Sequence, residues 1–284
     1  MSHTYRLVFD CPDQVGIVTR VGQIITENGG WISQATHHSD EESNHFFSRF
    51  EIKADSLPFD AQELREKFKT LAQDLNMNLR VIDSQIPKRA VLMASKGSHC
   101  LTDLLDRWHS GDLKCEIPCI ISNHEDMRGL SEHYGIPYHY VPIEKDNKQK
   151  GFDEVERLVN EYKADCVVLA RYMQIIPQAL CEQYVNRLIN IHHSFLPSFI
   201  GGRPYHQASR RGVKLIGATS HYVTEQLDEG PIIEQDVVRV SHSDTIEDLV
   251  RLGKDVEKTV LARGVRAHLE DRILVHGNKT VVFK

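Results

Sequence analysis

The feature that most constrains the fold is a series of short apolar runs, each separated from the next by a stretch with helical character. The runs occupy residues 90–94, 117–122, 138–141, 166–170 and 188–191. Strands buried on both faces of a sheet read as continuous apolar runs, and parallel strands need a crossover helix between them. The pattern therefore predicts an α/β domain with a mostly parallel, Rossmann-like sheet covered by helices.

Beyond residue 214 the spacing of the apolar residues changes. Longer runs at residues 215–223 and 232–240 indicate longer strands, and a helix is expected from about residue 244 to 268. The chain then ends in RILVH-GN-KTVVF, in which the Gly277-Asn278 pair suits the tight turn of a terminal hairpin.

The first 85 residues have a different order of elements. Helices are expected at residues 15–28 and 60–76, and strands at residues 5–9, 31–36, 46–52 and 79–82. This order predicts a ferredoxin-like βαββαβ sheet with its helices on one face. Because 284 residues exceed the usual size of one domain, we expect a domain at 1–85, a linker containing Pro87 at 86–89 and a second domain at 90–284.

Composition and charge exclude several classes of protein. The formal net charge of -6 comes without a concentrated basic face, which argues against nucleic-acid binding. An alternating strand pattern begins at once, and no apolar stretch has the length of a signal peptide or membrane span, so we expect a cytoplasmic protein without a membrane partner. The six scattered cysteines suit reduced core thiols, and the lone C-x3-C of Cys115 and Cys119 makes structural zinc the weaker alternative.

Reactive side chains are densest at residues 190–198, where a buried strand ends. The carboxyl ends of strands in open α/β sheets border the ligand crevice. Asn190 and His192 would supply an oxyanion donor and a proton carrier. The Asp228 of a Leu-Asp-Glu-Gly-Pro turn would supply a carboxylate that orients the histidine and helps to deprotonate a nucleophile. Covalent catalysis is disfavoured, because Gly-x-Ser-x-Gly is absent and no cysteine has an adjacent basic partner.

The segment NIHHSFLPSF, followed by GGRPYHQASRRGVKLIGATSHYVTEQLDEGPIIEQD, closely resembles the folate-dependent formyltransferase-like family. The resemblance implies that Asn190, His192 and Asp228 form the catalytic set and that folate is the substrate, with no cofactor. It also implies a slot for the pterin, whose rim is formed by five consecutive residues, Arg171, Tyr172, Met173, Gln174 and Ile175. We expect no metal, because His192, His193 and His206 lack the helical i, i+4 pair of zinc proteases.

Within that family the chain most resembles the formyltetrahydrofolate deformylase branch, through HHSFLPSF, the PYHQA segment at 204–208 and an extra N-terminal domain. The resemblance implies hydrolysis of 10-formyltetrahydrofolate to formate and tetrahydrofolate, which supplies formate for purine synthesis and balances the folate pools. The turn at residues 95–100 is poorer in glycine than the phosphate-binding turn of relatives that formylate glycinamide ribonucleotide. Water is therefore the favoured acceptor, and transfer to such an amine is the alternative.

Three further histidines, His193, His206 and His221, either line the site or only pack beside it, and both interpretations stay open. The Gly201-Gly202 pair is either a flexible loop or an anion-binding nest. The alternative role of Asp228 is to cap its own turn. Its place in a recognised motif favours the catalytic role.

The opening CPDQVGIV resembles the first strand-to-helix turn of ACT domains, which implies a regulatory module within a homo-oligomer. Methionine and glycine are the effectors that the resemblance implies. They would bind near five residues, Asp13, Gln14, Val15, Gly16 and Gly30. Asp13 and Gly16 have a nearly equal alternative as helix N-terminal residues. A third function, an amino-acid-binding regulator with an inactive second domain, is disfavoured by the intact catalytic set.

Overall fold

The computed structural model describes residues 3–198 and 204–284 of the chain. Contacts divide them into two compact units. The first contains the described residues up to Pro87, together with Glu270–His276 and Val281–Lys284. The second contains Lys88–Leu269 and Gly277–Thr280.

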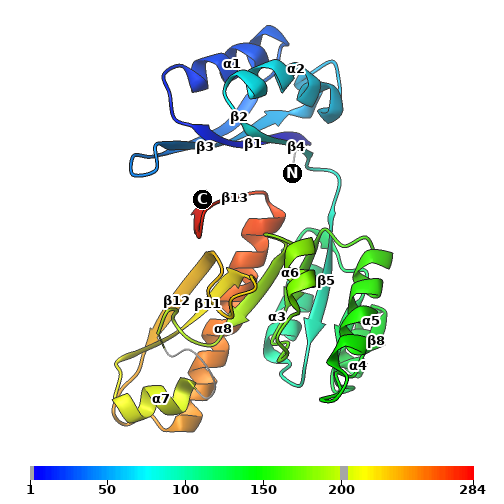
Figure 1. Ribbon diagram of the computed structural model, residues 1–284, viewed down its shortest axis with the longest axis vertical. Coiled ribbons are helices and arrows are strands. Elements are labelled where there is room, and N and C mark those ends of the chain that lie inside the picture. Colours follow the sequence, from blue (N-terminus) through cyan, green and yellow to red (C-terminus); the bar gives the residue numbers. More distant parts are fainter. Residues whose placement is uncertain (1–2, 199–203) are drawn as a thin grey trace. The chain divides into compact units, whose positions relative to one another are not determined.

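The first unit is built on a four-stranded antiparallel sheet in the order β2-β3-β1-β4. Its helices α1 and α2 lie on one face of the sheet (Figure 1). The elements are β1 (Thr4–Pro12), α1 (Ile17–Glu27), β2 (Ile32–Asp40), β3 (His45–Lys53), the short 3-10 helix η1 (Ala54–Ser56), α2 (Ala61–Asp74) and β4 (Asn78–Asp83). The predicted βαββαβ fold is confirmed, and this arrangement fits an ACT domain.

Local sequence explains where the two helices of this unit begin. Gly16 has a φ of 91°, so α1 starts after it, two residues later than the periodicity predicted. At α2 the Asp60 side chain accepts a hydrogen bond of 2.9 Å from the Glu63 backbone N–H, the usual contact of a helix N-cap.

The other face of the same sheet is partly covered by the end of the chain. Val8 and Phe47 are buried against Leu274, which lies in β13 (Ile273–His276), and against Phe283, which follows β14 (Lys279–Val282). Arg6 adds an ion pair of 3.1 Å with Asp271. Most of the terminal segment thus groups with the first unit, whereas the sequence placed it in a second domain at 90–284. The reason is that β1 and β3 carry apolar side chains on both faces.

The second unit is built on a mixed sheet in the order β12-β11-β10-β9-β5-β7-β8, with β6 paired to β5. Its strands are β5 (Lys88–Ala94), β6 (Cys115–Glu116), β7 (Ile120–Ser122), β8 (Tyr138–Tyr140), β9 (Cys166–Leu169), β10 (Leu188–His192), β11 (Leu215–Tyr222) and β12 (Ile232–Arg239). Strands β8, β7, β5, β9 and β10 are parallel, and β11 and β12 are antiparallel additions. The predicted Rossmann-like, mostly parallel sheet is confirmed.

Two details of this sheet differ from the sequence prediction. β5 begins at Lys88, inside the expected linker at 86–89. The apolar run at residues 117–122 forms strand only from Ile120, because Pro118 has no N–H to donate to a ladder.

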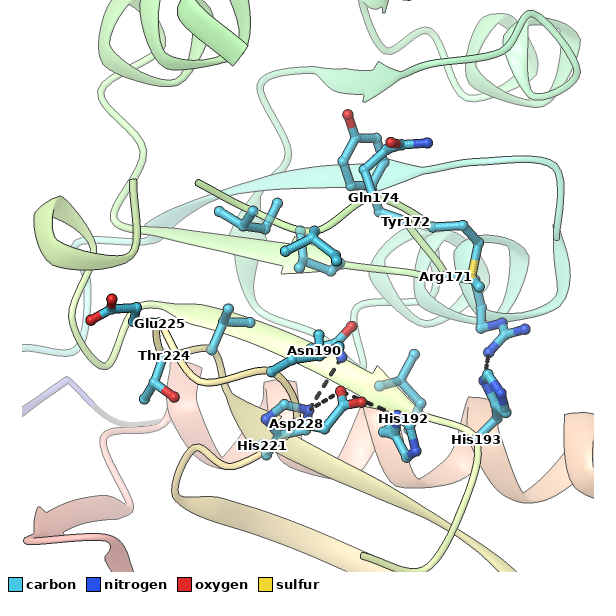
Figure 2. A pocket seen from close by; sticks show the side chains of 17 residues that line it. Arg171, Tyr172, Gln174, Asn190, His192, His193, His221, Thr224, Glu225 and Asp228 are labelled. Carbon is cyan, nitrogen blue, oxygen red and sulfur yellow. Dashed lines mark hydrogen bonds and ion pairs between the residues drawn. The ribbon is translucent and has the colours of Figure 1, made fainter. Parts of the chain in front are cut away.

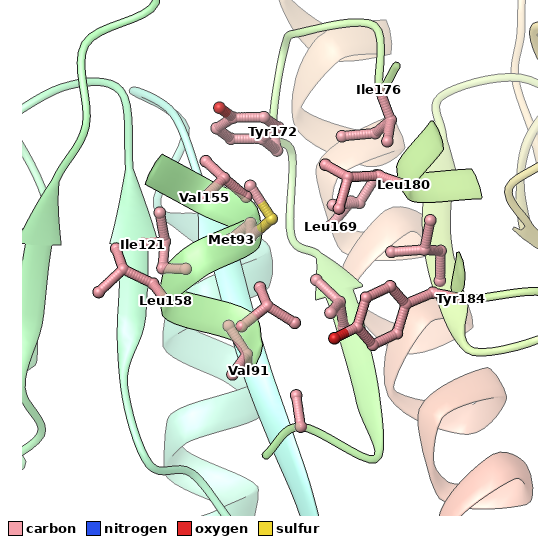
Figure 3. Packing of buried hydrophobic residues seen from close by; sticks show 14 of the residues in the cluster. Val91, Met93, Ile121, Val155, Leu158, Leu169, Tyr172, Ile176, Leu180 and Tyr184 are labelled. Atoms are coloured by element: carbon pink, nitrogen blue, oxygen red, sulfur yellow. The ribbon is translucent and has the colours of Figure 1, made fainter. Parts of the chain in front are cut away.

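Helices cover both faces of this sheet. They are α3 (His99–His109), α4 (Arg128–His133), α5 (Lys148–Glu161), α6 (Gln178–Gln183), α7 (Pro204–Arg211) and α8 (Ile246–Leu269). On one face, Val91 and Met93 of β5 pack with side chains of α5 and α6 (Figure 3). The long helix α8 runs against β10, β11 and β12 and packs on α3. Among the described helices, none is long and apolar enough to span a membrane.

The order of the parallel strands reverses between β5 and β9, since later strands are added on opposite sides of this pair. Open α/β sheets bind ligands at such a switch point, outside the carboxyl ends of the strands. At those ends lie the turn after β5, the turn after β9 and the last residues of β10.

Candidate active site

Asn190 and His192 lie two residues apart on β10, so both side chains leave the same face of the strand. Asn190 is directly opposite His221 in the antiparallel pair of β10 and β11. Its amide Nδ2 is 3.2 Å from His221 Nε2 (Figure 2). Strand register therefore explains why Asn190 contacts His221, which is 31 residues away in the sequence.

The contacts of His221 fix its tautomer. Its Nδ1 is 2.9 Å from the Tyr222 carbonyl oxygen, which can only accept, so this nitrogen carries the proton. Burial lowers the pKa of His221, which keeps the imidazole neutral. Its Nε2 therefore has a lone pair and accepts from the Asn190 amide. One N–H and the oxygen of that amide remain for a substrate.

Asp228 reaches His192 from the turn between β11 and β12. Its Oδ1 is 3.2 Å from His192 Nδ1 and 3.8 Å from His221 Nε2. Burial alone would raise the pKa of the Asp228 carboxyl, but the hydrogen bond with His192 and the neighbouring histidines hold that pKa below its usual value. Asp228 is therefore an anion that binds the Nδ1–H of His192.

This contact leaves His192 Nε2 as the reactive nitrogen of the ring. That atom is buried and has no hydrogen-bond partner among the described residues. A buried imidazole nitrogen without a partner is costly in an empty protein, so it marks the place where a substrate or water binds.

Beside these groups lies a cleft with a volume of ≈ 290 Å³. All of the predicted pterin rim, Arg171, Tyr172, Met173, Gln174 and Ile175, lines it, as do the predicted histidines His193 and His221. Met173 and Ile175 are 57% and 66% exposed, which gives the slot an apolar mouth. Thr224, Glu225 and Leu227 also line the cleft, and the sequence did not single them out.

His206 is the one of the three further histidines that the structure does not bring to the cleft. It lies on an exposed side of α7, whose neighbouring residues Tyr205 and Ala208 face the protein, and it is absent from the residues that line the cleft. The phase of the helix explains this, because positions three apart, such as 205 and 208, share a face that the position directly after the first does not. Gly201 and Gly202 lie outside the described residues.

A buried carboxylate that the sequence analysis missed lies behind the cleft. Glu257 of α8 is 1% exposed, and its Oε2 is 2.9 Å from His99 Nε2 and 3.4 Å from Arg171 Nε. The Tyr205 hydroxyl donates to its other oxygen. Burial would raise the pKa of Glu257, but the hydrogen bond from His99 and the charge of Arg171 keep that pKa below its usual value. The sequence did contain an indication that Glu257 is buried, because it lies on a helix face whose positions at 253, 260, 261 and 264 are all buried.

Among the described residues, one group has three potential metal ligands close together, namely His99, Cys100 and Glu257. The Arg171 guanidinium and the Tyr205 hydroxyl already occupy the Glu257 carboxylate. A metal ion would have to displace an arginine of the same charge sign, so these contacts do not favour a metal centre.

Of the residues that the sequence assigned to regulation, those from Asp13 to Gly16 lie together just before α1 in the first unit, and Gly30 lies beyond the other end of that helix. Asp13, Gln14, Val15 and Gly16 connect β1 to α1, and the Val15 side chain is fully exposed. Ser39 donates to the Asp13 carboxylate. Gly30 has a packing explanation, because a Cβ there would lie 2.6 Å from Ile25 Cγ2.

Taken together, the cleft offers an amide donor, a carboxylate-bound imidazole and an apolar slot. An imidazole whose Nδ1 is held by a carboxylate can take a proton at Nε2 and later return it. A neighbouring amide can stabilise an oxyanion. This set suits acyl transfer from a partly apolar donor molecule.

Comparisons with known proteins agree over nearly the whole chain. A family model described as formyl transferase matches residues 88–265. The formyltetrahydrofolate deformylase of Synechocystis sp. is 50% identical over 280 residues, which cover 99% of this chain and 98% of the relative. The corresponding protein of Bacillus subtilis is 46% identical over 98% of this chain and 93% of its own.

Solved structures give the same result. A crystal structure of a formyltetrahydrofolate deformylase from Pseudomonas syringae pv. tomato matches with a TM-score of 0.99 and 61% identity, covering 100% of this chain and 95% of that one. Glycinamide ribonucleotide transformylase 1 from Symbiobacterium toebii matches with a TM-score of 0.66 and 29% identity, over 73% of this chain and 98% of that one.

Proposed function

Because the chain belongs to the formyl transferase family, and its full-length relatives are formyltetrahydrofolate deformylases, we propose that it hydrolyses 10-formyltetrahydrofolate to formate and tetrahydrofolate. The observation that carries the proposal is the His192 ring, held at Nδ1 by Asp228 and left without a partner at its buried Nε2. Asn190 lies beside it on the same strand face.

In the reaction, the pterin lies in the slot rimmed by Arg171–Ile175, with its formyl group beside Asn190. His192 Nε2 accepts a proton from a water molecule as the water oxygen bonds to the formyl carbon. Asp228 stabilises the imidazolium that forms, and the Asn190 N–H and protonated His192 stabilise the oxyanion. The carbon–nitrogen bond then breaks, His192 returns the proton to the leaving nitrogen, and formate is released.

Transfer of the formyl group to an amine is the competing function, and the shared catalytic set does not separate the two. The extent of the matches favours hydrolysis, since the deformylases cover the whole chain and the transformylase covers only part of it. The experiment is to incubate the purified protein with 10-formyltetrahydrofolate without an acceptor and to assay formate. Formate release supports the proposal. Absence of formate, with transfer to added glycinamide ribonucleotide, contradicts it.

Folate is the substrate, and the proposed chemistry needs no further cofactor and no metal. Exhaustive chelation should therefore leave formate release unchanged, and a loss restored by zinc contradicts this part of the proposal. The free thiols of all six cysteines are consistent with a reducing, cytoplasmic location. In that setting the reaction supplies formate for purine synthesis and balances the one-carbon folate pools.

The first unit is proposed to be a sensor, because it contains a separate core and none of the catalytic groups. We expect methionine and glycine as opposing effectors, bound near Asp13, Gln14, Val15, Gly16 and Gly30. A homo-oligomer joined partly through residues 1–85 belongs to the same proposal. Support comes from the exposed turn between β1 and α1 and from the fit to an ACT domain.

A further inference from the structure

Two neighbouring histidines in the cleft each have a charged partner at ring nitrogen Nδ1, and the two partners have opposite charges. His192 Nδ1 is 3.2 Å from the Asp228 carboxylate, and the Arg171 guanidinium contacts His193 Nδ1 (Figure 2). The two rings are stacked, with centroids 5.1 Å apart and an interplanar angle of 13°. Both side chains line the same cleft.

These partners determine which nitrogen of each ring carries hydrogen. A carboxylate only accepts, so His192 Nδ1 is protonated and its Nε2 is the basic atom of the neutral ring. A guanidinium only donates, so His193 Nδ1 must have the lone pair and its single proton is on Nε2. The pair therefore offers one proton acceptor and one hydrogen-bond donor within a single cleft.

The tautomer of His193 is fixed by groups deep in the protein. Arg171 has a φ of 64°, and its Nε is 3.4 Å from Glu257, which is itself held by His99 and Tyr205. The charged or titratable groups facing His193 are thus Arg171, Glu257, His192, Asp228 and Tyr205. Burial, followed by the charge of Arg171, lowers the pKa of His193 to about 4, so its ring is neutral near pH 7.

We propose that His193 holds the attacking water for hydrolysis, by donating from Nε2 to the water oxygen while His192 Nε2 accepts the water proton. A water molecule is itself a donor and an acceptor, which is the complement of this pair. A neutral His193 also avoids placing a second positive charge against His192, whose protonation the reaction needs. Glu257 and Arg171 act through His193 and are positioning residues. The inference rests on the proposed hydrolase function.

The kinetic test compares two substitutions at the same position in the full-length protein. His193→Gln keeps an N–H donor, and His193→Leu removes it. We expect His193→Leu to lower kcat for formate release about 100-fold, with KM changed less than about threefold, and His193→Gln to recover at least about tenfold of that loss. The matched control is His242→Leu, an exposed histidine in the loop between β12 and α8, which should retain wild-type kinetics.

A second nucleophile separates water positioning from general damage to the site. Hydroxylamine attacks the same formyl carbon to give formohydroxamate and tetrahydrofolate, and it does not depend on a bound water. In His193→Leu the ratio of hydroxamate to formate should rise about tenfold or more over the wild type. An equal loss of both products, or a defect confined to KM, overturns the inference.

The tautomer itself is measurable without turnover. In protein labelled with ¹⁵N-histidine, the His193 signals, assigned by their loss in His193→Gln, should show a protonated Nε2 and an unprotonated Nδ1 at pH 7. The opposite tautomer overturns the inference even where wild-type hydrolysis is normal. Failure of the wild type to release formate overturns the proposed function instead, so the two failures are distinguishable.

Discussion

Gly230 packs directly on the backbone of Tyr222, so closely that a Cβ at Gly230 would lie 1.8 Å from the Tyr222 carbonyl oxygen. This contact sets the path of the turn that carries Asp228, whose φ of 59° is left-handed. The glycine of the Leu-Asp-Glu-Gly-Pro motif is therefore a requirement of packing, and through the turn it determines where the carboxylate meets His192.

Gly230→Ala should lower kcat about 100-fold, because the added methyl group forces the turn away from Tyr222 and misplaces Asp228 by a fraction of an ångström or more. Steady-state formate release measures this. Gly129→Ala is the matched control, since a Cβ at Gly129 meets nothing within 4 Å. Normal kcat in Gly230→Ala would mean that the turn does not set the carboxylate position.

Asp228→Asn keeps the shape of the side chain but removes its charge. The amide no longer stabilises the imidazolium of His192, so kcat should fall by about 10²- to 10⁴-fold while folate binding persists. Single-turnover formate release and a folate binding titration provide the two measurements. Glu229→Gln, an exposed neighbour in the same turn, serves as the control. Normal turnover in Asp228→Asn would remove Asp228 from the mechanism.

Asn190→Ala deletes the amide that contacts His221 Nε2 at 3.2 Å and that is proposed to donate toward the oxyanion. Loss of one such donor typically costs about 100- to 1,000-fold in kcat. The expected signature is a fall in kcat at nearly constant KM. A raised KM with unchanged kcat would instead identify Asn190 as a binding residue.

The pH dependence of stability should report the partly buried histidine His193. Its folded pKa of about 4 lies below the unfolded value of about 6.5, so between these values the unfolded chain binds more protons. Stability from this group is complete above pH 6.5 and is lost as the pH falls toward 4. The free energy of unfolding, measured with urea between pH 7 and 4.5, should decrease as the pH falls. His193→Gln should reduce the slope of this free energy against pH by up to about 1.4 kcal/mol per pH unit. His242→Gln, at an exposed position, should leave the slope unchanged.

The sensor proposal predicts that methionine and glycine change the rate of the full-length protein in opposite directions. A coupling free energy of about 1–3 kcal/mol corresponds to roughly 5- to 150-fold in affinity. In Asp13→Ala the ratio of rates with and without effector should move toward one. Glu66→Ala, on the exposed side of α2, should respond as the wild type does. An unchanged response in Asp13→Ala argues against this turn as the effector site.

The placement of Asn190 and His192 on one strand face was predictable because it follows from strand geometry. Residues two apart on a strand share a face, and Asn190 and His192 are two apart at the end of a buried run. The apolar runs also predicted the parallel sheet, since alternation with helices leaves few other folds. Asp228 was found only through its motif, because nothing in local periodicity brings a distant turn to a histidine.

The parts that escaped prediction depend on partners that are distant in the sequence. Glu257 lies on an otherwise buried helix face, but its partners His99, Arg171 and Tyr205 come from three separate segments. For the same reason, the sequence did not predict where the terminal hairpin packs. The local sequence pattern did not predict the second apolar face that Val8 and Phe47 give the first sheet, and only the folded chain shows that Phe283 packs against it.

The shared cluster of Val8, Phe47, Leu274 and Phe283 has a consequence for synthesis on the ribosome. The four strands of the first sheet are complete at Asp83, but one of its apolar faces stays uncovered until translation reaches Phe283. At the usual ~5–20 residues per second, that interval lasts on the order of ten seconds or more. A nascent chain therefore exposes this face throughout the synthesis of the catalytic unit. A product that terminates before β13 would expose it permanently, which makes such a product a natural target for chaperones and proteases.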